Sequence, residues 1–244
     1  MTLRAGIIAA GRGDRLRGDA QTLKPLVRVG GRTLVEHVLE SLGEAGPSEV
    51  AIIINEASTA VRDHVSARHW PFALRWMVET TPSSMHSFLR IVETLAESGD
   101  QGPFLISTVD TVATKGAYAR FIADARRPGV EDADVTLALT PPASDDDTPL
   151  LVALDPRDGR TVRAMGDGAK QSTLATAGYY AVRPSILREA DAARRDEIRA
   201  LRVFLGRLLA RGYRIDGVRA PDSIDVDRPL DVDAAEAFLR RVSP

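Results

Sequence analysis

The sequence predicts an α/β fold, a single domain whose mixed, mostly parallel sheet is flanked by helices. Short apolar runs alternate with segments in which apolar residues recur at helical spacing, which is typical of strand–helix–strand units. The first apolar run, residues 5–10, stops at Gly11, as a buried parallel strand does before a loop. A length of 244 residues with 44% hydrophobic residues suits one domain over residues 1–244 with one sizeable core.

The first half of the chain reads as four strands, each followed by a helix. Helical spacing of apolar residues predicts the helices, and Gly46-Pro47 ends the first of them. Ser84 is a suitable N-cap for the helix that it begins, and Thr33 can cap the first helix. The expected strands are residues 5–10, 50–54, 72–78 and 103–107, and the expected helices are residues 33–45, 57–68, 84–97 and 116–126.

The second half is less regular. A strand over residues 134–139 precedes a polar loop, residues 140–149, whose three consecutive acids indicate a solvated turn more than a metal site. The turn sequence D-P-R-D-G-R predicts a hairpin within residues 150–164. The remaining expected elements are a strand over 177–182, helices within 185–209 with a break at an undetermined point, a strand over 214–218 and a closing helix over 230–242.

Composition excludes several classes of function. A formal charge of -2 gives no global reason to expect a nucleic-acid partner, and the absence of cysteine excludes disulfides and thiolate metal sites. No apolar stretch is long enough for a membrane span or a signal segment, so we expect a cytoplasmic protein with no membrane partner.

A glycine-rich cationic loop follows the first strand. Gly11, Gly13 and Gly18 are interspersed with Arg12, Arg15 and Arg17, and Lys24 follows. Glycine lets backbone N–H groups turn toward a phosphate, and Arg or Lys adds charge-assisted hydrogen bonds. The spacing matches neither a Walker A loop nor a dinucleotide fingerprint. Because ligands of open α/β sheets bind beyond the carboxyl ends of the strands, we expect this loop, residues 80–84 and Asp110 to meet in one crevice.

These residues resemble a known family. The segments A-A-G-R-G-D-R-L, K-P-L and G-G-R-T-L-V-E-H are similar to the signature of nucleotidyltransferases that activate sugar phosphates and related alcohol phosphates. One departure is Thr33, where the family usually has proline. The resemblance implies a Rossmann-like nucleotide-diphospho-sugar transferase fold and a Mg²⁺-dependent transfer of NMP from an NTP to a phosphorylated acceptor, with release of pyrophosphate.

The resemblance also implies roles for individual residues near the triphosphate. Arg15 would hold the β and γ phosphates, and Lys24 would hold the α phosphate and the incoming acceptor phosphate. The other nucleotide-binding positions would be Ala9, Ala10, Gly11, Gly13, Thr80 and Ser84. The family commonly shows Gly-Thr-Ala where this chain has residues 80–84, so the resemblance does not identify the nucleobase of the NTP.

Three aspartates match the metal-binding positions of the family. Asp110 follows a predicted strand, and I-D-V-D-R-P-L-D resembles the family's late D-x-x-T-P-E-D-L segment. Aligned on Pro229, Asp225 takes the metal position, while some relatives use the place of Asp227. Mg²⁺ is typically held by one or two carboxylates together with phosphate oxygens. We therefore rank Asp225 ahead of Asp227 as the partner of Asp110.

The acceptor side rests on weaker matches. A-G-Y-Y-A-V resembles the strand that lines the acceptor pocket in the family, which assigns Gly178 and Tyr179 to it, and Lys170 is either a further acceptor ligand or an exposed loop lysine. The motif fits a molybdopterin guanylyltransferase or a cytidylyltransferase equally well, and a non-catalytic nucleotide-binding relative is the alternative outside enzymes. A glycosyltransferase would need D-x-D at Asp110, where Thr111 and Val112 follow instead.

Overall fold

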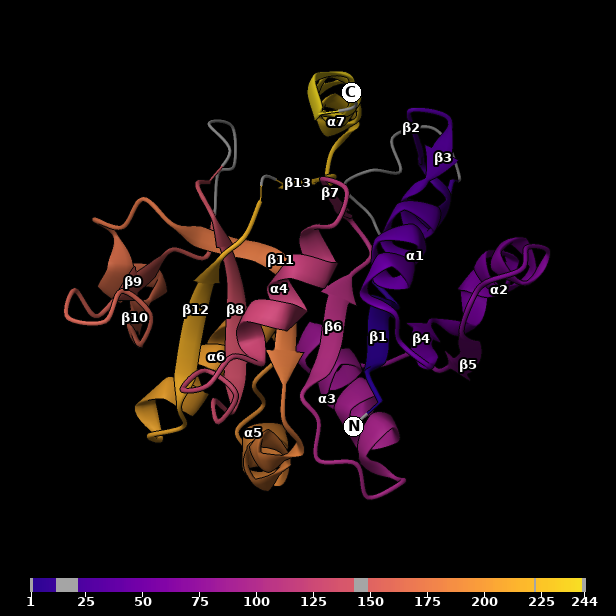
Figure 1. The fold of residues 1–244 in the computed structure, drawn as a ribbon. Coiled ribbons are helices and arrows are strands. Elements are labelled where there is room, and N and C mark those ends of the chain that lie inside the picture. The colour runs from indigo at the N-terminus through magenta and orange to yellow at the C-terminus, as the bar shows by residue number, and fades with distance from the viewer. Residues whose placement is uncertain (1, 12–21, 143–148, 222, 243–244) are drawn as a thin grey trace.

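Seven strands form the central sheet of the structure, a computed structural model that describes residues 2–11, 22–142, 149–221 and 223–242 (Figure 1). Their order across the sheet is β12-β8-β11-β6-β1-β4-β5. Only β11 runs antiparallel to its neighbours β6 and β8, which confirms the expected mixed, mostly parallel sheet. The strands are β1 (Arg4–Ala9), β4 (Glu49–Ile54), β5 (Ala73–Val78), β6 (Phe104–Thr108), β8 (Val135–Thr140), β11 (Ala175–Val182) and β12 (Ile215–Arg219).

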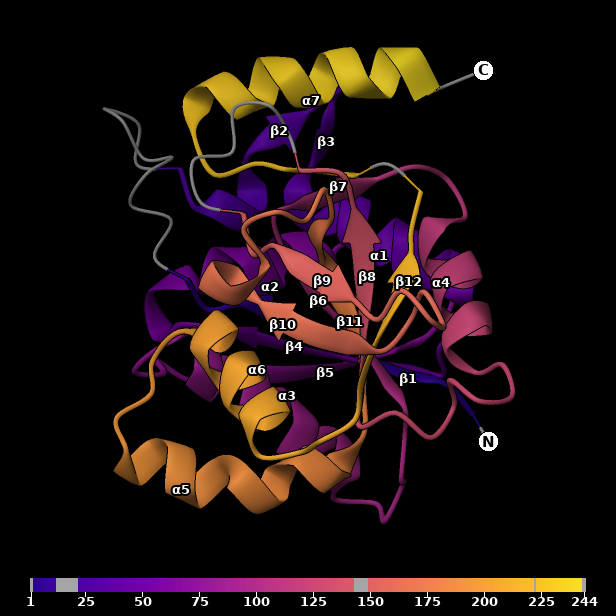
Figure 2. The ribbon, with the colours of Figure 1, turned by 90° about the vertical axis from the view of Figure 1, so that its left-hand side faces the viewer.

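Helices cover both faces of this sheet (Figure 2). The side chains of α1, α2 and α4 share one buried cluster with the sheet, and those of α3, α5 and α6 share the other. The helices are α1 (Leu34–Ala45), α2 (Thr59–Ser66), α3 (Ser84–Ala96), α4 (Ala117–Ala125), α5 (Ala190–Arg195), α6 (Leu201–Ala210) and α7 (Pro229–Val242), with 3₁₀ turns η1 (Lys24–Leu26), η2 (Glu56–Ser58), η3 (Gly166–Ala169) and η4 (Pro184–Glu189).

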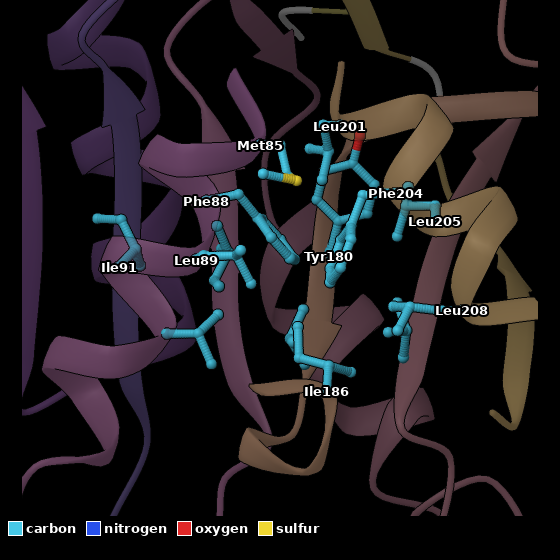
Figure 3. Close-up of a cluster of buried hydrophobic side chains, with 14 of the residues drawn as sticks. Met85, Phe88, Leu89, Ile91, Tyr180, Ile186, Leu201, Phe204, Leu205 and Leu208 are labelled. Carbon is cyan, nitrogen blue, oxygen red and sulfur yellow. The ribbon is translucent and has the colours of Figure 1, made fainter. Parts of the chain in front are cut away.

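An aromatic group anchors α3 and α6 to the sheet (Figure 3). The ring of Phe88 meets Tyr180 of β11 edge-on at 6.2 Å between centroids, and meets Phe204 of α6 at 6.4 Å. Such edge-to-face contacts add to the free energy of apolar burial. They fix the starts of α3 and α6 relative to the ends of the strands.

Three short antiparallel pairs lie outside the main sheet. The hairpin of β9 (Val152–Leu154) and β10 (Val162–Met165) confirms the turn expected within residues 150–164. The pair β2 (Arg28–Val29) and β3 (Arg32–Thr33), and the pair β7 (Thr111–Ala113) and β13 (Ser223–Asp225), were not expected.

Helix α7 lies over both unexpected pairs (Figures 1 and 2). It packs Ala235 and Phe238 against Val29, Val112 and Val226 in a third, smaller apolar cluster. The end of the chain is thereby tied to segments that follow β1 and β6.

The N-caps expected for two helices had different outcomes in the structure. Thr33 and Glu36 form a reciprocal capping box at the start of α1, which agrees with the capping role expected of Thr33. The expected cap of α3 was wrong, because Ser83 is the N-cap and Ser84 is the first helical residue. The hydroxyl of Ser84 accepts a hydrogen bond from the backbone N–H of Leu201 (3.1 Å) at the start of α6 instead.

The hydrogen bonds of Glu36 predict that the fold loses stability at low pH. Burial alone would raise its pKa, but the backbone N–H of Thr33 (2.8 Å) and the guanidinium of Arg68 (2.6 Å) lower the pKa to about 2. A carboxylate with a lowered pKa stabilises the fold above its unfolded-state pKa, and that contribution is lost as the pH falls from about 4.5 to 2. We expect the difference to reach about 3 kcal/mol at most.

Urea unfolding at pH 6 and pH 3 tests this point. Glu36→Gln should lose stability at pH 6 and show a smaller change between the two pH values than the wild type. Glu40→Gln is the control, because Glu40 lies on the same helix with a partly exposed side chain. A Glu36→Gln protein with the same acid dependence as the wild type would contradict the assignment.

Candidate functional site

The carboxyl ends of β5, β4, β1 and β6 lie side by side and form one edge of the site. Ala9 ends β1, and the carbonyl of Ala10 accepts a hydrogen bond from the Asn55 side chain (3.3 Å), just after β4. The backbone N–H of Glu56 donates to the hydroxyl of Thr80 (3.3 Å) beyond β5. Gly11 continues from Ala10, so the structure places Ala9, Ala10, Gly11 and Thr80 along one row.

Lys24 forms the centre of the charged part of the site. Its side chain is only 11% exposed, and its ammonium group donates to Oδ2 of Asp110 (2.6 Å) and to Oδ1 of Asp227. The two carboxylates come from positions more than a hundred residues apart along the chain. The lysine of K-P-L, the aspartate after β6 and the late acidic segment therefore meet, which agrees with the expected approach of Lys24 to Asp110. Residues 12–21 of the expected loop lie outside the described residues.

Buried contacts hold the 3₁₀ turn that carries Lys24. Pro25 is buried in the first turn of η1, and the N–H of Leu34 donates to the carbonyl of Val27 (2.9 Å). Nε2 of the buried His37 donates to the carbonyl of Val29 (2.9 Å). These contacts tie the turn to the start of α1, and His37 has a structural role in them.

Asp225 reaches the same place through the pairing of β13 with β7. In this pair Asp225 lies opposite Thr111, whose hydroxyl donates to Oδ1 of Asp225 (2.9 Å). The next residue, Val226, donates its N–H to the carbonyl of Asp110 (3.0 Å). The structure thus brings Asp110, Asp225 and Asp227 together around Lys24.

The site aspartates differ in how closely the positive charge of Lys24 neutralises them. Burial by itself would lower the pKa of Lys24, but Asp110 and Asp227 raise the pKa well above its ordinary value. Burial would raise the pKa of Asp110, yet Lys24 holds it below its usual range. Asp225 is exposed to solvent at the edge of the site, and the protein atoms around its carboxylate and the negative charge of Asp110 raise its pKa above the usual value of an aspartate. Among the described residues, Asp225 is the one of the three site aspartates that makes no hydrogen bond to Lys24.

Several residues that contribute to the site were not among those expected from the sequence. Asp231, in the first turn of α7, accepts the backbone N–H groups of Asp227 (2.8 Å) and Arg228 (2.7 Å) on one carboxylate oxygen. Asn55 and Thr111 hold Ala10 and Asp225 as described above. An acid two residues after a proline that starts a helix is a capping signal, so Asp231 could have been found from the sequence.

Gly178 lies in the site, whereas the side chain of its neighbour does not. A Cβ atom on Gly178 would stand 2.1 Å from the hydroxyl of Thr111 and 3.2 Å from Oδ1 of Asp225. The Tyr179 side chain is fully buried on the other face of β11, where its ring stacks on Tyr118 at 4.3 Å. Tyr179 can therefore offer an acceptor only its backbone, and its assignment to the acceptor pocket stays a prediction.

Gly178→Ala should be strongly destabilising, because two costs combine. Gly178 has φ +77°, where a side chain is strained by about 1–3 kcal/mol, and the new methyl group would overlap the Thr111 hydroxyl. Gly212→Ala is the matched control, since Gly212 has φ +82° and its Cβ would meet nothing within 4 Å. Thermal unfolding should show a larger loss for Gly178→Ala, and equal losses would mean that the space beside Thr111 is not needed.

Other predicted site residues are not brought to this cluster. Lys170 is exposed, pairs with Asp167 (3.1 Å) and lines an open cavity of about 570 Å³ between η3 and β9 to which none of the three site aspartates contributes. Ser84 is held against the start of α6. Arg15 and Gly13, like Arg12, Arg17, Gly18 and the acidic loop 145–147, lie outside the described residues.

The acidic side chains of the site supply only some of the ligands that a hard cation such as Mg²⁺ requires. Within residues 2–11, 22–142, 149–221 and 223–242, no three acidic or histidine side chains are grouped closely enough to hold a metal ion by themselves. A Mg²⁺ site that is completed by phosphate oxygens needs only one or two carboxylates from the protein. Asp110 and Asp225 fit such a half-built site, because carboxylate oxygens are suitable ligands and Asp225 makes no hydrogen bond to a lysine or arginine in the part of the chain that the structure describes.

Comparisons with known proteins agree with this geometry. The family profile described as MobA-like NTP transferase domain matches residues 5–202. The chain is 30% identical over 190 residues, 77% of its length, to the CMP-5'-(3-aminopropyl)phosphonate synthase of Streptomyces rubellomurinus, and this match covers 29% of that protein. It is 28% identical over 113 residues, 45% of its length, to the mannose-1-phosphate guanyltransferase of Emericella nidulans, covering 31% of that protein. The chain thus spans less than a third of the curated relatives it matches.

A solved structure shares the fold over the whole chain. The inositol-1-phosphate CTP transferase of T. maritima superposes with a TM-score of 0.76 at 15% identity, covering 100% of this chain and 98% of that one. No helix in the described part of the chain is both long and apolar enough to cross a membrane.

Proposed function

Since the chain belongs to the MobA-like NTP transferase domain family, we propose that it transfers NMP from an NTP to a sugar 1-phosphate or a related phosphorylated alcohol. Pyrophosphate is the second product. The observation that carries the proposal is the Lys24 ammonium group, held between Asp110 and Asp227 beside the ends of β1 and β6. A buried, permanently charged lysine at a strand-end crevice is suited to bind phosphate.

The reaction needs no nucleophilic side chain. An oxygen of the acceptor phosphate attacks the α phosphorus, the new P–O bond forms, and the bond from the α phosphorus to the bridging oxygen breaks with pyrophosphate as the leaving group. A phosphate monoester has a second pKa near 6, so it is already an anionic nucleophile at neutral pH. The chain is left with the tasks of positioning and charge compensation.

Lys24 would perform both tasks. In the absence of phosphate, its ammonium group is neutralised by Asp110 and Asp227. Phosphate oxygens would compete with these carboxylates for the same N–H groups. Lys24 can then contact the α phosphate and the acceptor phosphate together, which brings two anions within reaction distance.

Asp110 and Asp225 are the residues that would hold Mg²⁺. When bound, Mg²⁺ would neutralise charge on the triphosphate and polarise its oxygens. Asp227 is the second candidate, because alignment on Pro229 places Asp225 at the metal position of the family; the carboxylate of Asp227, like that of Asp110, is paired with Lys24. Asp225 has no lysine or arginine hydrogen bond among the described residues.

CTP is the nucleotide that we propose first. The support is the name of the relative from Streptomyces rubellomurinus, which makes a CMP conjugate of a phosphonate. An aliphatic phosphate or phosphonate presents the same anionic oxygens to Lys24 as a sugar phosphate does. The acceptor panel must therefore include both.

A matrix of substrates tests the proposal. ATP, GTP, CTP and UTP are each combined with sugar 1-phosphates, polyol phosphates, choline phosphate and an aminoalkyl phosphonate in Mg²⁺, and pyrophosphate release is measured. We expect release that depends on one nucleotide and one acceptor class. Nucleotide binding without acceptor-dependent pyrophosphate release in any combination would indicate a non-catalytic relative and would contradict the proposal.

A further inference from the structure

A buried hydroxyl donates a hydrogen bond to the Asp225 carboxylate. Thr111 is 1% exposed, and its Oγ1 donates to Oδ1 of Asp225 at 2.9 Å across the β7–β13 pair. The other oxygen, Oδ2, has no hydrogen-bond partner in the part of the chain that the structure describes. Thr111 therefore fixes which oxygen of Asp225 is available to a ligand in the crevice.

A second hydroxyl supports the first. Oγ1 of Thr108 lies 3.0 Å from Oγ1 of Thr111 and 3.2 Å from the carbonyl oxygen of Gly178. Because a hydroxyl has one proton, Thr108 can donate either to Thr111 or to the carbonyl of Gly178, while Thr111 gives its own proton to Asp225. When Thr108 donates to Thr111, the two threonines, at the end of β6 and the start of β7, form a short chain of hydrogen bonds that ends at Asp225.

Gly178 leaves the space that these two hydroxyls occupy. A Cβ atom there would stand 2.1 Å from Oγ1 of Thr111 and 2.9 Å from Oγ1 of Thr108. The register of β11 against β8 shifts between Thr176 and Tyr180, which is where the glycine approaches. A side chain at residue 178 would therefore overlap the hydroxyls of Thr108 and Thr111, so this position needs glycine.

We propose that Thr111 is a positioning residue, which holds Oδ1 of the Asp225 carboxylate and so leaves Oδ2 as the oxygen that would bind a cation. The inference rests on the proposed function, since it assigns Asp225 to the metal. It also assigns Gly178 a different role from acceptor contact, namely to leave room for Thr108 and Thr111. Hydrogen bonds that orient a metal ligand typically change metal affinity or activity by about 10- to 100-fold.

Three variants separate positioning from a merely structural role. Thr111→Val keeps the shape of the side chain and removes the hydroxyl, whereas Thr111→Ser keeps the hydroxyl. Thr114→Val is the control, because the hydroxyl of Thr114 is buried without a partner among the described residues just beyond β7. Thermal unfolding establishes that each variant is folded, and Thr111→Ala is the smaller hydroxyl-free variant if Thr111→Val is not.

The main readout is Mn²⁺ affinity with and without CTP, measured by electron paramagnetic resonance and without acceptor. We expect Thr111→Val to weaken Mn²⁺ binding at least about tenfold, with Thr111→Ser and Thr114→Val close to the wild type. Wild-type affinity in folded Thr111→Val, or a wild type that binds no Mn²⁺, would overturn the inference. A wild type that binds Mn²⁺ in a Thr111-dependent way but releases no pyrophosphate would leave the inference standing and contradict only the proposed function.

Discussion

Lys24→Met is expected to lower kcat at least about a hundredfold while changing the KM for nucleotide much less. The ammonium group would meet both the α phosphate and the attacking phosphate, so its contribution grows as charge redistributes in the transition state. Methionine keeps most of the length of the side chain and removes the charge. Initial rates over a range of nucleotide and acceptor concentrations measure the two parameters separately.

Two controls accompany this variant. Lys115→Met removes the charge of an exposed lysine and should behave as the wild type. Removing Lys24 also leaves Asp110 and Asp227 without their cation, and breaking a buried pair in this way can cost about 3–5 kcal/mol of stability. Rates are therefore compared well below the unfolding temperature of each protein. An unchanged kcat with a raised KM for nucleotide would mean that Lys24 serves binding alone.

Asp110→Asn and Asp225→Asn should each reduce pyrophosphate release by at least about a hundredfold. Residues that merely orient metal ligands are worth about 10- to 100-fold, so the ligands themselves should matter at least as much. The double variant should be little worse than either single one, because loss of one ligand already disables the shared ion. The rates are followed across a Mg²⁺ titration.

Asp227→Asn and Asp233→Asn complete this set. Asp233 is an exposed residue of α7 and should tolerate the change. Asp227→Asn removes one of the two carboxylates that hold Lys24, so we expect a smaller loss than for Asp225→Asn. Near wild-type activity in Asp225→Asn together with an inactive Asp227→Asn would move the second ligand two residues along the chain.

Much of the sheet was predictable because its strands are long, buried runs. Residues 50–54 and 103–107 correspond to β4 and β6 within one residue at each end. The ends of these strands, and hence the placement of Asp110, follow from the rule that parallel strands share one carboxyl edge. Thr33 and Glu36 similarly carry their capping box in the sequence itself.

The pairing that delivers Asp225 was not predictable. Strands β7 and β13 have three residues each and pair across 110 positions of sequence, so neither shows a periodic pattern. The N-cap at Ser83 rather than Ser84 reflects tertiary context, since Ser84 bonds to α6. The burial of the Tyr179 side chain follows from a simple rule. Successive residues of a strand face opposite sides of the sheet, so if Gly178 faces the crevice its neighbour must face the core.

The fate of isotopically labelled nucleotide tests the central claim most directly, that this site transfers a nucleotidyl group. The protein, the nucleotide and acceptor selected by the substrate matrix, and Mg²⁺ are incubated with either α-³²P- or γ-³²P-labelled NTP. We predict that the α label appears in a conjugate with the acceptor and the γ label in pyrophosphate, and that both disappear in Lys24→Met. Transfer of the γ label to the acceptor, or its release as inorganic phosphate, would contradict the account.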